Sequence, residues 1–146
     1  MNYRLIRQNF LLGRAGEIKW IKILRKQYPS IIDNNEKDRY SSMDACSVDN
    51  DILIEHELKC RKITHNQYRG LMVNKCKIDK SIINLNNNIR QIYYWSCLDG
   101  LYYWELYDFE KQKNELIFYK NGNKSAGLPI TDVVDIKTKY LTKYEF

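Results

Sequence analysis

The sequence Asp51-Ile52-Leu53-Ile54-Glu55-His56-Glu57-Leu58-Lys59-Cys60-Arg61 determines how the rest of the chain is interpreted. It is rich in aliphatic and β-branched residues and begins at a turn-like Asp49-Asn50-Asp51, so it predicts a strand. Because side chains alternate between the faces of a strand, one face is mostly apolar and can enter a core: Ile52, Ile54, His56 and Leu58. The other face carries Leu53, Glu55, Glu57 and Lys59. Two acids and a lysine at roughly 6–7 Å intervals also suit an ordinary exposed sheet face.

A second strand is predicted just upstream, in residues 39–48, with the turn at 49–51 joining the two into an antiparallel hairpin. Directly paired residues lie on the same face of a sheet, so the length of the connection decides where Asp44 points. A four-residue connection, which pairs Val48 with Leu53, puts Asp44 on the face that carries the acids and the lysine. A three-residue connection puts it on the opposite face, unless a bulge intervenes. We expect the four-residue connection.

On this register Asp44, Glu57 and Lys59 converge, and their charges suggest a ligand. Two acids close together resist ionising unless a cation lies between them. Mg²⁺ prefers oxygen ligands and is typically held by one or two carboxylates together with substrate phosphate. The hairpin therefore predicts a site for Mg²⁺ or Mn²⁺.

The order of these residues resembles the PD-(D/E)XK nuclease superfamily. Its motif is an Asp on one strand and Glu-x-Lys on the next, with a Glu on the preceding helix. Asp44 and Glu57-Leu58-Lys59 match the strand residues, and Glu17 in Gly13-Arg14-Ala15-Gly16-Glu17 matches the helix acid. Gln67 matches a Gln that many members carry after the lysine strand, while Met43 stands where the motif has Pro. The resemblance covers roughly residues 10–80.

The resemblance implies a restriction-endonuclease-like core, in which a central mixed sheet is flanked by helices, and metal-dependent cleavage of phosphodiester bonds, with DNA the expected substrate. Asp44, Glu57, the Leu58 carbonyl and Glu17 would hold the metal, Lys59 would position the attacking water, and Gln67 would complete the catalytic set. The expected nucleic-acid contacts are Arg14, Arg61, Lys62, His65 and Tyr68. Resolvases, restriction enzymes and repair nucleases share this core. The superfamily's resolvases are small dimers of similar length, so junction cleavage by a homodimer is one expectation within this class.

Composition suits a single globular domain, residues 1–146, which is 44% hydrophobic and 29% charged. A net charge of +6 suits a polyanionic partner, although many basic proteins bind none. No run approaches the roughly 20 apolar residues of a membrane span, and no secretory signal is visible. The four widely spaced cysteines form no C-x-x-C pair. We therefore expect reduced thiols in an intracellular protein of the cytoplasm or nucleus.

Along the chain, helical spacing predicts an amphipathic helix over residues 10–27, and Ile31-Ile32 suggests an edge strand. Thr64-His65-Asn66-Gln67 fits a capping box and predicts a helix to about Lys77. A loop at 84–88 and strands over 89–97, 101–108 and 115–120 follow, with a turn at 110–114. Thr131 would cap a final helix that reaches Tyr144. The order helix, hairpin, helix, hairpin, strand, helix predicts an α/β fold.

Other interpretations remain open. The chain could be a nuclease-fold module without catalysis that binds nucleic acid or a protein, or a small assembly protein that uses its aromatic hairpins as an interface. Glu17 could be a solvated helix acid, and Gln67 could be only a cap. The aromatic residues of the C-terminal half could stack on bases or pack across strands. His56 is expected to be structural.

Overall fold

The computed structural model describes residues 3–37 and 43–145 of the 146-residue chain. Its larger sheet has the strand order β1-β2-β3-β5-β6-β9. Strands β3 and β5 run parallel, and every other neighbouring pair is antiparallel, so the sheet is mixed. The bounds are β1 (Ile32–Asp33), β2 (Ala45–Asp49), β3 (Ile52–Cys60), β5 (Arg90–Cys97), β6 (Gly100–Leu106) and β9 (Thr142–Lys143).

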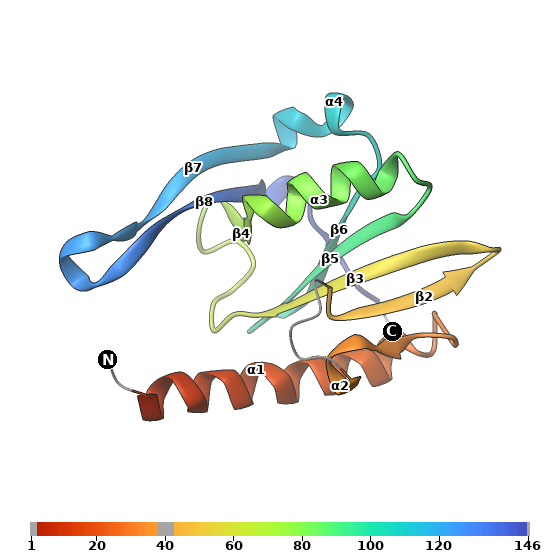
Figure 1. Ribbon diagram of the computed structural model, residues 1–146, viewed down its shortest axis with the longest axis horizontal. Helices are drawn as coiled ribbons and strands as arrows, with labels where there is room; N and C mark the ends of the chain where they lie inside the picture. The colour runs from red at the N-terminus through yellow and green to blue at the C-terminus, as the bar shows by residue number, and fades with distance from the viewer. Residues whose placement is uncertain (1–2, 38–42, 146) are drawn as a thin grey trace.

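A smaller antiparallel sheet has the order β4-β8-β7, formed by β4 (Gly70–Asn74), β8 (Leu128–Lys137) and β7 (Leu116–Asn123). The β7–β8 ribbon extends away from the body of the molecule (Figure 1). The helices are α1 (Tyr3–Leu24), α2 (Asn34–Lys37), α3 (Lys75–Leu85) and α4 (Phe109–Gln112). Short 3-10 turns cover Lys113–Glu115, Lys124–Ala126 and Thr138–Tyr140. The expected α/β class with a mixed central sheet is confirmed.

The larger sheet is covered on both faces. Helix α1 packs on one face, where its residues Trp20, Ile21 and Leu24 meet side chains of β3 and β5. The other face packs against α3 and the smaller sheet. The buried cluster there combines the aromatic residues Tyr93, Trp95 and Trp104 with aliphatic residues, among them Leu106, Leu71, Val73, Ile78, Val134 and Ile136. Figure 1 shows α1 and α3 on opposite sides of the strands. Consecutive residues of β3 therefore face different helices.

The β2–β3 hairpin has the register that the sequence predicts, although Asp49 also pairs with Ile52 and the turn itself has two residues. Val48 pairs with Leu53, and the two turn residues Asn50 and Asp51 have φ values of 49° and 63°. Asn and Asp tolerate this left-handed conformation better than most residues, and two positive φ values in a row are typical of a type I′ hairpin turn. His56 is fully buried, as expected, and its ring contacts Tyr28 and Tyr94.

Two expectations about the elements are wrong. The helix predicted over 64–77 is instead a series of turns followed by β4, because Leu71 and Val73 alternate inward and pair with β8. The final helix predicted from Thr131 is the strand β8, in which β-branched residues favour an extended backbone. The loop expected at 84–88 is present as turns over 86–88, and α3 extends two residues into it, to Leu85.

Smaller differences concern element ends. Helix α1 begins at Tyr3 and ends at Leu24, so it starts earlier and stops sooner than the predicted 10–27. The predicted turn at 110–114 contains most of α4 and the start of a 3-10 turn. Asp108 caps α4 by accepting a hydrogen bond from the Lys111 backbone N. Within the ranges that the structure describes, no helix has both the length and the apolar character needed to cross a membrane.

Candidate functional site

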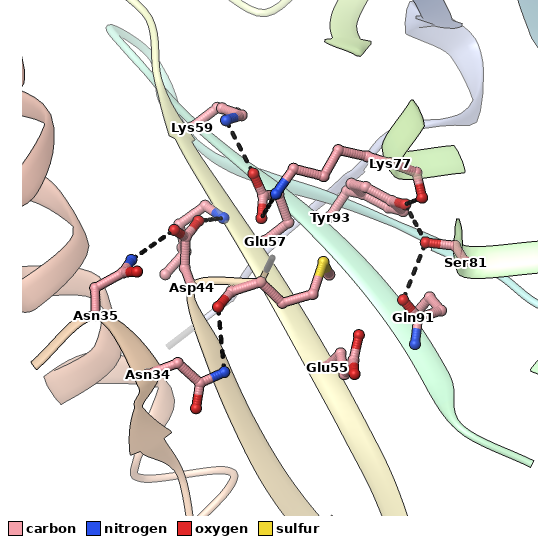
Figure 2. A network of polar contacts seen from close by, with 12 residues as sticks. Asn34, Asn35, Asp44, Glu55, Glu57, Lys59, Lys77, Ser81, Gln91 and Tyr93 are labelled. Carbon is pink, nitrogen blue, oxygen red and sulfur yellow. Dashed lines mark hydrogen bonds and ion pairs between the residues drawn. The ribbon is translucent and has the colours of Figure 1, made fainter. Parts of the chain in front are cut away.

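The site lies where β2 stops short alongside β3. The last residue pair of the hairpin ladder is Ala45 with His56. Beyond it, Asp44 replaces the missing strand, because its Oδ2 accepts a hydrogen bond from the Leu58 backbone N at 2.7 Å. A strand residue directs its N–H and its C=O to the same edge, so the Leu58 carbonyl faces this edge too. Figure 2 shows the Asp44 carboxylate close to the Glu57 and Lys59 side chains of β3.

Glu57 is the most buried acid of this region, only 2% exposed. Lys59 Nζ lies 2.9 Å from its Oε1, and Lys77 Nζ lies 3.4 Å from its Oε2. Lys59 comes from the same strand, whereas Lys77 comes from α3, on the facing layer (Figure 2). The Tyr93 hydroxyl donates to the Lys77 carbonyl at 3.1 Å and so ties the start of α3 to the sheet. Each oxygen of the Glu57 carboxylate therefore has its own ammonium partner.

Charge and burial act against each other at Glu57 and Lys59. Burial raises the pKa of Glu57, and the nearby Asp44 carboxylate adds to this, while the two lysines oppose it. Burial alone would lower the pKa of Lys59, but the carboxylates of Glu57 and Asp44 outweigh it, so the pKa is raised. Lys59 is thus held as an ammonium beside an acid that gives up its proton less readily than a free glutamic acid.

Glu17 joins the site through Asn35. The Asn35 side-chain nitrogen donates to Asp44 Oδ1 at 2.8 Å and to Glu17 Oε2 at 3.2 Å. The two carboxylate oxygens therefore lie no farther apart than the sum of these contacts. Burial raises the pKa of Glu17, and the charge of Asp44 raises it further, although Arg14 and Asn35 oppose this. The structure thus brings together the helix acid and the strand acid that the sequence singled out.

Arg14 is engaged within the protein. Its guanidinium makes a two-pronged contact with Asp33, at 2.9 and 2.6 Å, and Nη1 also lies 3.0 Å from Glu17 Oε2. The hydrogen bonds that Arg14 donates to Asp33 raise the pKa of Arg14. Arg14 thus links Glu17 to Asp33 of β1, while its expected contact with nucleic acid stays a prediction.

The remaining candidates lie after β3, away from the carboxylates. Gln67 is exposed and donates to the Tyr68 hydroxyl at 3.3 Å; among the described residues it makes no hydrogen bond to Asp44 or Glu57. His65 is paired with Asp99 and stacks on Tyr102. Lys62 is exposed. The structure therefore does not bring Gln67 into the group formed by the acids and Lys59.

Two residues of the site were missed by the sequence analysis. Asn35 falls in a polar stretch with no periodic pattern, and its neighbour Asn34 donates from its side chain to the Met43 carbonyl at 3.2 Å and from its backbone to the Asp44 carbonyl at 2.9 Å. The sequence predicted Lys77 at the C-terminal end of a helix over 64–77, whereas it lies near the start of α3.

No family model, curated protein or solved structure matches this chain. Function is therefore argued from the arrangement of Asp44, Glu57 and Lys59.

The carboxylate oxygens in this region suit a hard divalent cation, but each of them already contacts another group of the protein. Across residues 3–37 and 43–145, no three His, Cys, Asp or Glu side chains gather closely enough to hold a metal ion. The two Asp44 oxygens accept from Asn35 and Leu58, and those of Glu57 face two lysines. Carboxylate and carbonyl oxygens are the ligands that Mg²⁺ prefers. A bound Mg²⁺ would take the place of some of these ammonium and amide contacts.

Proposed function

We propose that this chain is a metal-dependent nuclease that hydrolyses phosphodiester bonds in nucleic acid, with DNA as the expected substrate. The observation that carries the proposal is the meeting of Asp44, Glu57 and Lys59 where β2 ends, with Glu17 linked to Asp44 through Asn35. This is the set that the resemblance to the PD-(D/E)XK superfamily requires. Gln67 lies outside the set, and Lys77 is a second cation that the motif did not predict.

Asp44, Glu57 and the Leu58 carbonyl would hold Mg²⁺ or Mn²⁺, with Glu17 as a further acid. When bound, the metal would acidify a water and neutralise charge on the phosphate. Lys59 would orient the attacking water and stabilise the negative charge that grows on the phosphate oxygens in the transition state. Arg61 and Lys62 would contact backbone phosphates, which gives affinity without reading sequence.

The paired lysines support this assignment through charge balance. Without a divalent ion, Lys59 and Lys77 neutralise the buried Glu57 carboxylate. A divalent ion on the same carboxylate would release at least one ammonium beside the substrate phosphate, where positive charge is needed. At least one of the two lysines that pair with Glu57 in the free protein would thus contact the phosphate in the complex.

The second candidate function is a catalytically inactive module of the same fold that binds nucleic acid or a protein partner. One observation favours it: every carboxylate oxygen of Asp44 and Glu57 already has a protein partner. A site that is satisfied in this way could be purely structural. This alternative predicts salt-dependent DNA binding without cleavage.

The proposal is tested by incubating the purified chain with single-stranded, duplex and branched DNA and with RNA, in Mg²⁺ or Mn²⁺ and in EDTA. We expect cleavage of at least one DNA substrate, most readily a branched one, and its complete loss in EDTA. Activity that persists in EDTA would remove the metal from the mechanism. Binding without cleavage of any substrate would favour the inactive module, and the molar mass in solution would test the expected homodimer.

A further inference from the structure

A pocket opens between the end of β3 and the smaller sheet. Its walls include Arg61, Tyr68, Arg69, Tyr119 and Asp135, together with aliphatic side chains. The Arg61 backbone N donates to the Ser96 carbonyl at 2.8 Å, so the chain still runs beside β5 at this point. Residues two apart on an extended chain share a face and lie roughly 6–7 Å apart. Arg61 therefore connects the pocket to Lys59 and the site.

A buried acid holds two flat side chains of the pocket in place. Asp135 is 6% exposed, and it accepts a hydrogen bond from Arg69 Nε at 3.1 Å and from the Tyr119 hydroxyl at 2.8 Å. The Arg69 guanidinium carbon lies 4.8 Å from the centroid of the Tyr119 ring. The Arg69 side chain nevertheless stays 55% exposed. Because only one of its five N–H donors is used by Asp135, it can offer both a flat face and hydrogen bonds to a ligand.

Tyr68 adds a second aromatic surface. It is 61% exposed, which is unusual for a large aromatic side chain that lines a pocket. Its backbone is fixed all the same, because the Tyr68 carbonyl accepts from Thr138 Oγ1 at 3.1 Å and the next carbonyl, of Arg69, accepts from the Thr138 backbone N at 3.1 Å. The exposed ring is therefore presented from an anchored segment.

We propose that this pocket binds one unpaired nucleobase, next to the phosphate that would be cleaved at the site formed by Asp44, Glu57 and Lys59. The aromatic rings, the aliphatic walls and the exposed N–H donors of the guanidinium together suit a flat ring with polar edges. Stacking on aromatic residues is possible for any base. Arg61, between the pocket and Lys59, would contact the phosphate that joins the base to the scissile position. This inference rests on the proposed nuclease function and adds to it a preference for substrates with unpaired nucleotides.

The test measures binding in EDTA, so that cleavage plays no part. The probe is a fluorescein-labelled duplex with a short single-stranded tail, and a second probe has abasic sites throughout that tail. Anisotropy titrations compare wild type with Tyr68→Ala and with Tyr107→Ala. Tyr107 is the matched control, because it is 64% exposed and is absent from the pocket walls.

We expect Tyr68→Ala to weaken binding of the base-containing probe about tenfold, or about 1.4 kcal/mol, and Tyr107→Ala to leave it unchanged. Wild type should lose a similar factor with the abasic probe, on which Tyr68→Ala should have no further effect. Equal affinity of wild type for both probes, or equal losses in the two Tyr variants, would overturn the pocket assignment. Cleavage assays of wild type in Mg²⁺ separate the two claims: base-dependent binding without cleavage would refute the nuclease alone, and cleavage without base dependence would refute the pocket alone.

Discussion

Lys59 Nζ lies 2.9 Å from Glu57 Oε1, in an ion pair whose acid is only 2% exposed while the lysine side chain is 30% exposed. Removing one partner of a buried pair leaves an uncompensated charge, which typically destabilises a protein by about 3–5 kcal/mol. Here Lys77 provides a second cation on the same carboxylate. The two lysines can therefore be separated by mutation, with one partner always left for Glu57.

Lys77→Ala should strengthen metal binding. Without Lys77, a divalent ion has one fewer ammonium to displace from Glu57, and a hydrogen bond to a charged group is worth about 1.5–3 kcal/mol. We expect the Mg²⁺ concentration for half-maximal cleavage to fall about tenfold. The control is Lys75→Ala, in the same helix turn but paired with Asp79. An unchanged or increased Mg²⁺ requirement in the Lys77 variant would show that this lysine does not compete with the metal.

Asn35→Ala should reduce cleavage by about 10–100-fold, the usual effect of losing a residue that orients metal ligands. The Asn35 amide holds Asp44 and Glu17 together, so its loss leaves two neighbouring acids free to separate. Asn114→Ala, at an exposed position in a 3-10 turn, is the control and should retain full activity. If Asn35→Ala also retained full activity with an unchanged Mg²⁺ requirement, Glu17 would not belong to the site.

Gly16→Ala should destabilise the protein by about 1–3 kcal/mol, as is usual for overpacking. A Cβ at this position would overlap the Cys60 Sγ, so either the Cys60 side chain would have to rotate or α1 would have to move away from β3. At Gly13, in the same helix, a Cβ meets nothing within 4 Å, and Gly13→Ala should stabilise by about 0.5–1 kcal/mol. Urea unfolding measures both changes, and adding Cys60→Ala to Gly16→Ala should restore most of the loss. Equal effects of the two glycine substitutions would contradict this account of helix packing.

Stability should decrease in acid because of His56. Burial lowers the pKa of this histidine from 6.5 to about 3, and the charge of Arg90 adds to the shift. Below pH 6.5 the unfolded chain binds a proton that the folded chain does not, so stability is lost progressively as the pH falls from 6.5 toward 3. Well below 6.5 the loss from this group approaches about 1.4 kcal/mol per pH unit.

The His56 contribution is isolated by urea unfolding of wild type and His56→Gln between pH 7 and pH 5. The variant loses contacts with Ser47 and Tyr94, so we expect it to be less stable at pH 7 but to have a shallower dependence on pH. Parallel curves for the two proteins would show that His56 does not remain neutral in the fold.

The hairpin could be predicted because its local signals agree. Alternating apolar residues in β3, the Asn50 and Asp51 turn and the pairing of Val48 with Leu53 all point to one register. The predicted C-terminal helix failed because the signals there conflict. Thr131 is a good helix cap, but it pairs with Asn121 in the extended ribbon of β7 and β8, and burial of Val134 and Ile136 against the larger sheet outweighs the cap.

The site was predictable where it depends on the hairpin and not where it depends on packing between layers. The two-residue spacing of Glu57 and Lys59 and the position of Asp44 follow from strand geometry. Gln67 was assigned to the site by the superfamily pattern alone, and the helix expected to carry it does not form. Lys77 reaches Glu57 only because α3 packs on this face of the sheet. Such contacts between distant segments leave no local pattern in the sequence.

The central claim is tested most directly by comparing cleavage of branched DNA in Mg²⁺ by wild type, Asp44→Ala and Lys59→Ala, with circular dichroism to confirm that each variant is folded. The account predicts cleavage by wild type and none above background by either folded variant. Cleavage at the wild-type rate by both folded variants would contradict it and place the active site elsewhere in the chain.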